Sequence, residues 1–324
     1  LKPVPGVQPV LRFRNPPEGV VEFDDLVKGR IAVANEELDD LVIMRGDGVP
    51  TYNFGVVVDD VDMGITHVIR GDDHVNNTPR QINIYRAIGA ALPQFAHVPM
   101  ILGSDGERLS KRHGAVSVMQ YHEDGFLPEA LINYLARLGW SHGDAEIFSV
   151  DQFVQWFDLG HVSHSPAQFS PEKLRWLNQQ YVKTAADDRL AGLVGARLSA
   201  AGIDVRSGPE LALVVGILKS RSETLEVLAD EAMMFYASAH PAADLLATHV
   251  TPAVMPALKD LLVRFGQSDA WSAAVVAEHV KAVLKTHNLK MPALAMAIRA
   301  CVFGRTQTPD LATVLAIAGR KRVL

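Results

Sequence analysis

The sequence contains 324 residues, of which 48% are hydrophobic, and this length predicts two or three globular domains. No stretch reaches the roughly 18 consecutive apolar residues of a membrane span, and the N-terminus lacks the pattern of a signal peptide, so we expect a cytoplasmic protein with no membrane partner. A net charge of -6 argues against indiscriminate nucleic-acid binding, and the single cysteine, Cys301, excludes an internal disulfide or a cysteine-rich zinc site within these residues.

The N-terminal third predicts strands and a helix around a parallel sheet. Residues 52–60 (YNFGVVVDD) and 66–71 (THVIRG) are rich in β-branched residues and bounded by Gly and Asp, so we predict a strand for each. Residues 78–90 predict a helix, with Thr78 as its N-cap and Pro79 at the first helical position. This order of elements is typical of α/β domains.

Helical patterns dominate the rest of the chain. Pro128 and Pro171 each precede an apolar stripe with helical spacing, and from about residue 171 nearly every segment is helical by period. Thr-Pro pairs at residues 251–252 and 308–309 predict two further helix starts. We therefore place a boundary near residue 170, between a mixed α/β part and an all-α part.

Charged residues are unevenly distributed. Residues 22–47 hold eight acids against three bases, whereas residues 281–324 hold eight bases against Asp310 alone. A polyanion that touches one end of the molecule would favour such a basic end, and a solvated basic surface explains it equally well.

A basic loop lies at residues 106–118 (GERLSKRHGAVSV), where Arg108, Lys111 and Arg112 surround Ser110. Such a loop suits a mobile segment whose cations close over a phosphate chain. Lys111 is then the group that stabilises negative charge growing on the leaving oxygens. The alternative is an exposed basic loop without that role. No Walker-type P-loop is present to supply a phosphate site.

A second polar cluster, residues 68–81 (VIRGDDHVNNTPRQ), lies between a predicted strand and a predicted helix, where open α/β sheets bind ligands. Arg70 can hold a carboxylate in bidentate fashion, and Asp72 or Asp73 can meet a ribose or an amine. Tyr52 and Asn53, predicted on the same sheet, would complete a polar pocket. The alternative is that Arg70 and the two aspartates form a structural ion-pair set and that Tyr52 only packs.

Four segments of the chain point to one known family. They are residues 51–87, residues 95–118, residues 125–144 and residues 174–178 (LRWLN). Together they resemble bacterial glutamyl-tRNA synthetases, which are class I aminoacyl-tRNA synthetases, and the resemblance runs through essentially the whole chain. RLSKR at residues 108–112 is similar to the KMSKS-type signature of that family.

The resemblance implies the C-terminal part of a class I Rossmann-type catalytic domain of α/β class, followed by an all-α anticodon-binding domain. We expect the end of the inserted acceptor-binding region at residues 1–45, the second half of the catalytic domain with the KMSKS-type loop at 46–115, a stem-contact region at 116–170 and the anticodon-binding domain at 171–324. The HIGH-type motif of the family is absent, as is the region that carries zinc in some members. We therefore expect that an N-terminal portion is missing and that this fragment alone is inactive.

The resemblance also implies roles for individual residues. Those implied to bind ATP are Met100, Ile101, Ser110, Lys111, Arg112 and Asp73, with Lys111 as the catalytic group. Tyr52 and Arg70 are implied to hold the glutamate substrate, Arg70 through the side-chain carboxylate. No residue is implied to bind a metal ion.

In the helical part, the residues implied to meet anticodon bases are Arg299, Thr308, Pro309 and Leu311. Ordinary structural explanations stay open for three of them. Thr308 and Pro309 can form a helix cap, and Leu311 can belong to the core.

The activity implied is that of a glutamate–tRNA ligase acting as a monomer. Such an enzyme uses ATP with Mg²⁺ to convert L-glutamate to glutamyl-adenylate, then passes the glutamyl group to the 3′ end of tRNA(Glu). Arg70 would explain the choice of amino acid, because glutamine would leave its guanidinium unpaired. The alternatives are a related glutaminyl-tRNA synthetase and a catalytically inactive tRNA-binding fragment. The long helical part argues against a shortened tRNA-modifying relative, which lacks an anticodon-binding domain.

Overall fold

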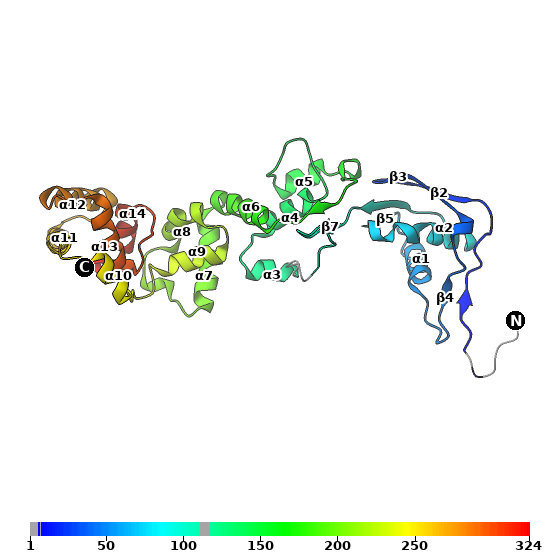
Figure 1. The fold of residues 1–324 in the computed structure, drawn as a ribbon, viewed down its shortest axis with the longest axis horizontal. Helices are drawn as coiled ribbons and strands as arrows, with labels where there is room; N and C mark the ends of the chain where they lie inside the picture. Colours follow the sequence, from blue (N-terminus) through cyan, green and yellow to red (C-terminus); the bar gives the residue numbers. More distant parts are fainter. Residues whose placement is uncertain (1–5, 7, 111–116) are drawn as a thin grey trace. The chain divides into compact units, whose positions relative to one another are not determined.

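The structure is a computed structural model that describes residue 6, residues 8–110 and residues 117–324. The chain forms two compact units. The first unit contains Leu1–Ala115 and Ile132–Ser170, and the second contains Val116–Leu131 and Pro171–Leu324. In Figure 1 the sheet strands of the first unit are blue to teal, and the helices that follow residue 171 in the second unit run from green through yellow to red.

A four-stranded sheet with strand order β3-β2-β6-β5 organises the first unit. Its strands are β2 (Val20–Asp25), β3 (Gly29–Ala34), β5 (His67–Gly71) and β6 (Gln94–Val98). Strands β2 and β3 form an antiparallel hairpin, while β6 runs parallel to both β5 and β2. A parallel sheet is confirmed, although of the two predicted strands only residues 66–71 contribute to it, as β5; β2 and β6 supply the other parallel strands and β3 adds an antiparallel edge.

Two helices pack beside this sheet, α1 (Tyr52–Asp62) and α2 (Thr78–Ala87). Ile82 of α2 is fully buried in one apolar cluster with residues of β2 and β6. Val57 of α1 is fully buried in another, together with Tyr85 of α2. Burial of each such side chain contributes about 1.5–3 kcal/mol, so α2 is fixed by both the sheet and α1.

The predicted strand over residues 52–60 is wrong, because these residues belong to α1. The apolar positions follow a helical period, at Phe54, Val57, Val58 and Val61. Valine favours strands, but this spacing places the apolar side chains on one face of a helix, and packing against α2 outweighs the weak β preference.

Two predictions about residue positions are corrected with it. Tyr52 begins helix α1 and is not on the sheet. Thr78 is not an N-cap, because the short 3-10 helix η2 (Asp72–Asn77) runs directly into α2. The Thr78 side chain is instead completely buried, and Pro79 lies in the first turn as predicted.

The remaining elements of the first unit are short. They are β1 (Leu11–Arg12), η1 (Asn35–Glu37), β4 (Val42–Met44), β7 (Ile101–Leu102), α5 (Val150–Trp156), η4 (Leu159–His161) and β8 (Ala167–Gln168). Strand β1 pairs antiparallel with β4, and β7 pairs parallel with β8. The β7–β8 pairing anchors the strand from which the basic loop departs.

The described residues of the second unit form helices and no strand, which confirms the predicted all-α part. The longer helices are α6 (Pro171–Thr184), α7 (Asp187–Ala200), α8 (Leu211–Leu218), α9 (Leu225–Met233), α11 (Met255–Gln267), α12 (Ala273–Thr286), α13 (Met291–Phe303) and α14 (Leu311–Ala318). Shorter ones are α3 (Val118–Glu123), η5 (Val205–Ser207), η6 (Lys219–Arg221), α10 (Ala243–His249) and α15 (Arg320–Val323). Helix α4 (Pro128–Arg137) begins in this unit and ends in the first. None of the described helices combines the length and apolar character that crossing a bilayer requires.

Helices α4 and α6 begin at Pro128 and Pro171, as predicted. The two Thr-Pro pairs do not begin helices directly. The carbonyl of Thr251 accepts amide hydrogen bonds within a turn, and α11 starts four residues later at Met255. Helix α14 is capped by the side chain of Asp310 rather than by Thr308.

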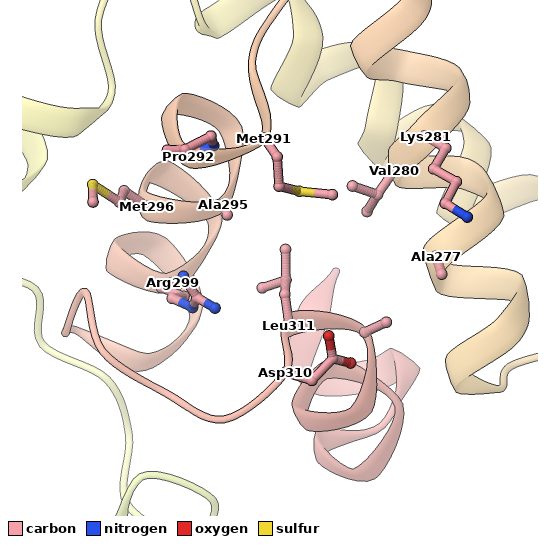
Figure 2. Close-up of a pocket in the computed structure, with 11 residues that line it drawn as sticks. Ala277, Val280, Lys281, Met291, Pro292, Ala295, Met296, Arg299, Asp310 and Leu311 are labelled. Atoms are coloured by element: carbon pink, nitrogen blue, oxygen red, sulfur yellow. The ribbon is translucent and has the colours of Figure 1, made fainter.

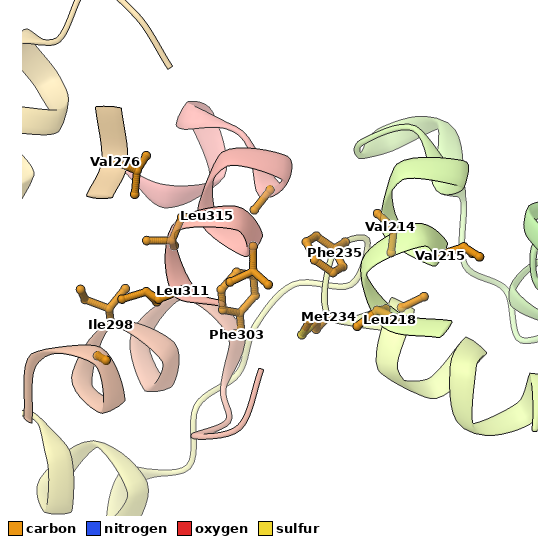
Figure 3. Close-up of a cluster of buried hydrophobic side chains, with 14 of the residues drawn as sticks. Val214, Val215, Leu218, Met234, Phe235, Val276, Ile298, Phe303, Leu311 and Leu315 are labelled. Carbon is orange, nitrogen blue, oxygen red and sulfur yellow. The ribbon is translucent and has the colours of Figure 1, made fainter. Parts of the chain in front are cut away.

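A continuous apolar core holds the second unit together. Figure 3 shows part of it, with Val276, Ile298, Phe303, Leu311 and Leu315 in one group and Val214, Val215, Leu218, Met234 and Phe235 in the other. The core includes residues from α4, from α6 to α9 and from α11 to α14, so α12, α13 and α14 are packed around shared apolar side chains.

Candidate functional site

Three parallel strands of the first unit end at one edge of the sheet. Asp25 ends β2, Gly71 ends β5 and Val98 ends β6, with Gly71 directly opposite Val98. Ligands of open α/β sheets bind in the crevice outside the carboxyl ends of such strands. This edge is therefore the candidate active site.

Arg70 is a half-buried side chain at this edge. Its Nε donates to His97 Nε2 at 3.2 Å, and its Nη2 donates to Thr78 Oγ1 and Gln81 Oε1, each at 2.8 Å. A longer contact of 3.5 Å joins Nη2 to the carbonyl of His74. Among the residues that the structure describes, no acceptor contacts Nη1. The guanidinium is thus held by neutral groups and keeps one edge for a carboxylate.

The two neighbouring aspartates bind other cations. Asp72 Oδ2 lies 2.8 Å from Lys28 Nζ, and Asp73 Oδ2 lies 3.2 Å from Arg108 Nη1. Neither forms an ion pair with Arg70 in the described part of the chain. The alternative in which Arg70 and these aspartates form a structural ion-pair set is therefore wrong.

A buried pair lies behind Arg70. His97 Nδ1 is 2.5 Å from Asp25 Oδ2, and both side chains are 0% exposed. Burial lowers the pKa of His97, outweighing the opposite effect of its hydrogen bond to Asp25. Burial alone would raise the pKa of Asp25, but hydrogen bonds from the Lys28 amide and from His97 bring it below its usual value. The pair is therefore a carboxylate with a neutral imidazole.

Other predicted residues lie near the same strand ends. Tyr52 is 54% exposed, and its ring centroid lies 5.6 Å from that of His74, next to Asp73. A Cβ at Gly71 would lie 2.6 Å from Asp73 Oδ1 and 3.7 Å from Met100 Sδ. Glycine is therefore what permits Asp73 to approach the backbone beside Met100. The structure thus brings Tyr52, Asp73 and Met100 together around the end of β5.

The basic loop starts from β7. The carbonyl of Ile101 accepts a hydrogen bond from the Leu109 amide at 2.9 Å, which closes the first part of the loop into a turn. Ser110 follows and is exposed. Lys111 and Arg112 lie outside the described residues, so their contacts with ATP phosphates stay predictions.

Three residues of this site, Asp25, His97 and Gln81, were not predicted from the sequence. Asp25 and His97 are 72 positions apart, and no local pattern pairs them. The usable signal was a polar residue at the end of each apolar strand, since a buried polar side chain needs a partner. No group of three or more His, Cys, Asp or Glu side chains in the described ranges is arranged to hold a metal ion.

The second unit contains a cavity of about 390 Å³ between α12, α13 and α14. Lys281 of α12 and Arg299 of α13 lie on opposite sides of it, and Asp310 and Leu311 at the start of α14 lie between them (Figure 2). The cavity therefore combines apolar walls with two cations and the Asp310 carboxylate, and the apolar walls beside the cations suit a nucleotide base joined to phosphate.

The structure brings three of the predicted anticodon residues into contact. Arg299 Nε donates to Thr308 Oγ1 at 2.8 Å, and its Nη2 lies 3.4 Å from the carbonyl of Pro309. The helix-cap explanation for Thr308 is wrong, because Asp310 caps α14. The core explanation for Leu311 is confirmed, since it is 7% exposed within the apolar core while also lining the cavity.

Two family models match the chain. Residues 3–176 match the model described as tRNA synthetases class I (E and Q), catalytic domain, and residues 174–324 match the model described as anticodon binding domain. These matches, with the mixed sheet and the helical second unit, confirm the predicted fold class.

Curated relatives and a solved structure are similar over nearly the whole chain. The glutamate–tRNA ligase of Thiobacillus denitrificans is 60% identical over 324 residues, which are 99% of this chain and 68% of that protein. That of Nitrosospira multiformis is 58% identical over 325 residues, covering 100% of this chain and 70% of that protein. The crystal structure of a glutamate tRNA ligase from Elizabethkingia meningosepticum in complex with its amino acid has a TM-score of 0.86 at 28% identity, covering 97% of this chain and 66% of that one. The chain thus spans about two thirds of the length of these proteins.

Proposed function

The chain belongs to the glutamate–tRNA ligase family of class I aminoacyl-tRNA synthetases, and on that basis we propose that it acts in ATP-dependent activation of L-glutamate and its transfer to the 3′ end of tRNA(Glu). The α-carboxylate of glutamate attacks the α-phosphate of ATP to form glutamyl-adenylate and pyrophosphate. The terminal ribose hydroxyl of the tRNA then displaces AMP. The relatives favour neither the glutaminyl enzyme nor an inactive RNA-binding fragment.

The half-buried guanidinium of Arg70 is the observation that supports this substrate most strongly. Its charge meets only neutral acceptors in the described part of the chain, and its Nη1 has none. A substrate carboxylate would supply the missing charge, whereas the amide of glutamine supplies a neutral oxygen. Hydrogen bonds to charged groups contribute about 1.5–3 kcal/mol, so this one contact favours glutamate over glutamine by roughly 10-fold to 150-fold.

The other residues of the first unit receive their roles from their position around Arg70. Tyr52 borders the amino acid, and those assigned to ATP are Asp73, Met100, Ile101, Ser110, Lys111 and Arg112. Lys111 neutralises charge on the departing pyrophosphate, so its effect is greatest in the transition state. Magnesium enters with ATP, bound to the phosphates.

The remaining regions serve the tRNA. We assign the end of the acceptor-binding region to residues 1–45, the second half of the catalytic domain to 46–115, stem contacts to 116–170 and anticodon recognition to 171–324. Arg299, Thr308, Pro309 and Leu311, at the cavity described above, would receive an anticodon base. The enzyme would act as a monomer in the cytoplasm, where translation takes place.

Substitution of Arg70 tests the proposed substrate. In the full-length enzyme with tRNA present, Arg70→Gln should raise the KM for glutamate in pyrophosphate exchange by about 10-fold to 150-fold, the loss of one charged hydrogen bond. The KM for ATP should stay within about twofold. Arg86→Gln, which removes an exposed arginine from the end of α2, is the matched control and should change neither constant. A glutamate KM equal to that of the control would exclude Arg70 as the carboxylate ligand.

A further inference from the structure

A chain of hydrogen bonds connects a buried carboxylate to the guanidinium of Arg70. Asp25 Oδ2 contacts His97 Nδ1 at 2.5 Å, and His97 Nε2 accepts from Arg70 Nε at 3.2 Å. Asp25 and His97 are fully buried, whereas Arg70 is half-buried. This series of hydrogen bonds therefore leads from the interior of the sheet to the edge proposed to bind the substrate.

Asp25 fixes the tautomer of His97. Its Oδ1 accepts amide hydrogen bonds from Val27 at 3.0 Å, Lys28 at 2.8 Å and His97 at 3.1 Å, so the carboxylate cannot rotate. Its Oδ2 is an acceptor only, which requires the imidazole proton to be on Nδ1. Nε2 then carries a lone pair and is an acceptor. It faces Arg70 Nε at 3.2 Å and the hydroxyl of Thr78 at 3.1 Å.

No other state of His97 fits beside Arg70. The opposite tautomer would place an N–H group against the Nε–H group of the guanidinium, donor against donor. The doubly protonated ring would add a positive charge beside an existing one. The neutral Nδ1–H form is the one that accepts from Arg70.

A planar guanidinium is oriented once two of its nitrogens are fixed. His97 fixes Nε, and Thr78 and Gln81 fix Nη2. Gln81 is itself oriented, because its Nε2 donates to Asn53 Oδ1 at 2.9 Å. Nη1 is then the nitrogen that remains for a ligand, and the contacts of Nε and Nη2 set the direction in which its N–H groups point.

We propose that Asp25 and His97 are positioning residues for amino-acid selection, which hold the Arg70 guanidinium with Nη1 directed at the side-chain carboxylate of glutamate. They touch no substrate and act through Arg70. This inference rests on the proposed role of Arg70 as the carboxylate ligand, and it adds that selectivity depends on the tautomer of a buried histidine.

Asp25→Asn tests the tautomer directly in the full-length enzyme. An asparagine oxygen can keep the three amide hydrogen bonds, but its NH₂ group would face Nδ1 and move the imidazole proton to Nε2, against Arg70. We expect the KM for glutamate to rise about tenfold, as for loss of one charge-assisted hydrogen bond, and the ratio of kcat/KM for glutamate over glutamine to fall by a similar factor. The KM for ATP should stay within about twofold. ¹⁵N NMR of the His97 ring should report the change of tautomer.

A pair of substitutions at His97 separates positioning from folding. In His97→Gln the side-chain oxygen can take the place of Nε2 and accept from Arg70, so the glutamate KM should stay within about threefold of wild type. His97→Leu removes the acceptor and should raise it about tenfold. Asp158→Asn is the matched control, because Asp158 contacts His161 Nδ1 at 2.7 Å in an exposed pair that touches no guanidinium in the described residues. It should leave the KM for glutamate and the KM for ATP within about twofold of wild type, which are the two constants compared with the His97 variants.

The double variant Arg70→Gln/Asp25→Asn should have the glutamate KM of Arg70→Gln alone, because Asp25 acts only through Arg70. If Arg70→Gln raises the glutamate KM but Asp25→Asn does not, the positioning role is refuted while the role of Arg70 stands. Equal effects of His97→Gln and His97→Leu refute it as well. If Arg70→Gln itself has no effect, the proposed carboxylate ligand is wrong and the positioning role with it.

Discussion

Removing Arg299 should weaken tRNA binding without changing glutamate activation. The side chain lines the cavity of about 390 Å³ and is fixed by hydrogen bonds to Thr308 and to the carbonyl of Pro309. An arginine contact to a base contributes about 1–3 kcal/mol. In Arg299→Ala the Thr308 hydroxyl keeps its contact with the Pro309 carbonyl at 2.9 Å, so the expected loss is that of the base contact. The KM for tRNA in aminoacylation should therefore rise by about 5-fold to 150-fold.

The assay compares aminoacylation at subsaturating tRNA with pyrophosphate exchange at saturating tRNA, where the variant should match wild type. Arg305→Ala is the charge-matched control, because Arg305 belongs to the same basic region but does not line the cavity. Arg299→Lys keeps the charge and loses the contact with Thr308, so it should fall between wild type and Arg299→Ala. If Arg299→Ala and Arg305→Ala raise the tRNA KM equally, the effect is one of net charge and Arg299 has no specific contact.

Two further predictions concern stability. Leu311→Ala should lower the free energy of unfolding by about 2–5 kcal/mol, because the side chain is 7% exposed in the core, and a loss below about 1 kcal/mol in urea unfolding would contradict that. Burial lowers the pKa of His97 from its usual 6.5, so below that pH the unfolded chain binds a proton that the folded chain excludes, and stability falls as pH decreases toward the folded pKa. The pKa of Asp25 is also lowered, and its contribution is lost only in the more acidic range, as pH falls from the usual 3.8. Wild type should therefore lose more stability than His97→Gln between pH 7.5 and 5.5, by at most about 1.4 kcal/mol per pH unit; parallel curves would exclude this role for His97.

Local patterns were sufficient for the helical part of the chain and for β5 and α2 in the first unit, but not for β2, β3, β4 or β6. Pro128 and Pro171 begin helices because proline fits the first turn, and β5 follows from its β-branched run. The segment 52–60 was assigned incorrectly because its valines satisfy the strand preference and the helical period at once. Only packing against α2 decides between the two, and that contact involves residues distant in the sequence.

The sequence predicts those site residues whose charge and position alone indicate a function. Arg70 is one of them, because it is a cation at the end of a predicted strand. Its hydrogen bonds to His97, Thr78 and Gln81 cannot be predicted in this way. His97 resembles any histidine in an apolar strand until Asp25 is placed beside it by the parallel pairing of β2 and β6. Such a pair depends on sheet order, which one sequence does not display.

The dependence of Arg70 on its interior neighbours limits how this pocket can be redesigned. Replacing Arg70 with a neutral residue to admit an uncharged amino acid would leave His97 Nε2 with the Thr78 hydroxyl alone, and would leave the amide oxygen of Gln81 without its donor. A variant that accepts a different amino acid would therefore need substitutions at Arg70 and at its hydrogen-bond partners together. Libraries that vary only the pocket surface should therefore return weak enzymes, and those that also vary positions 25, 81 and 97 should return better ones.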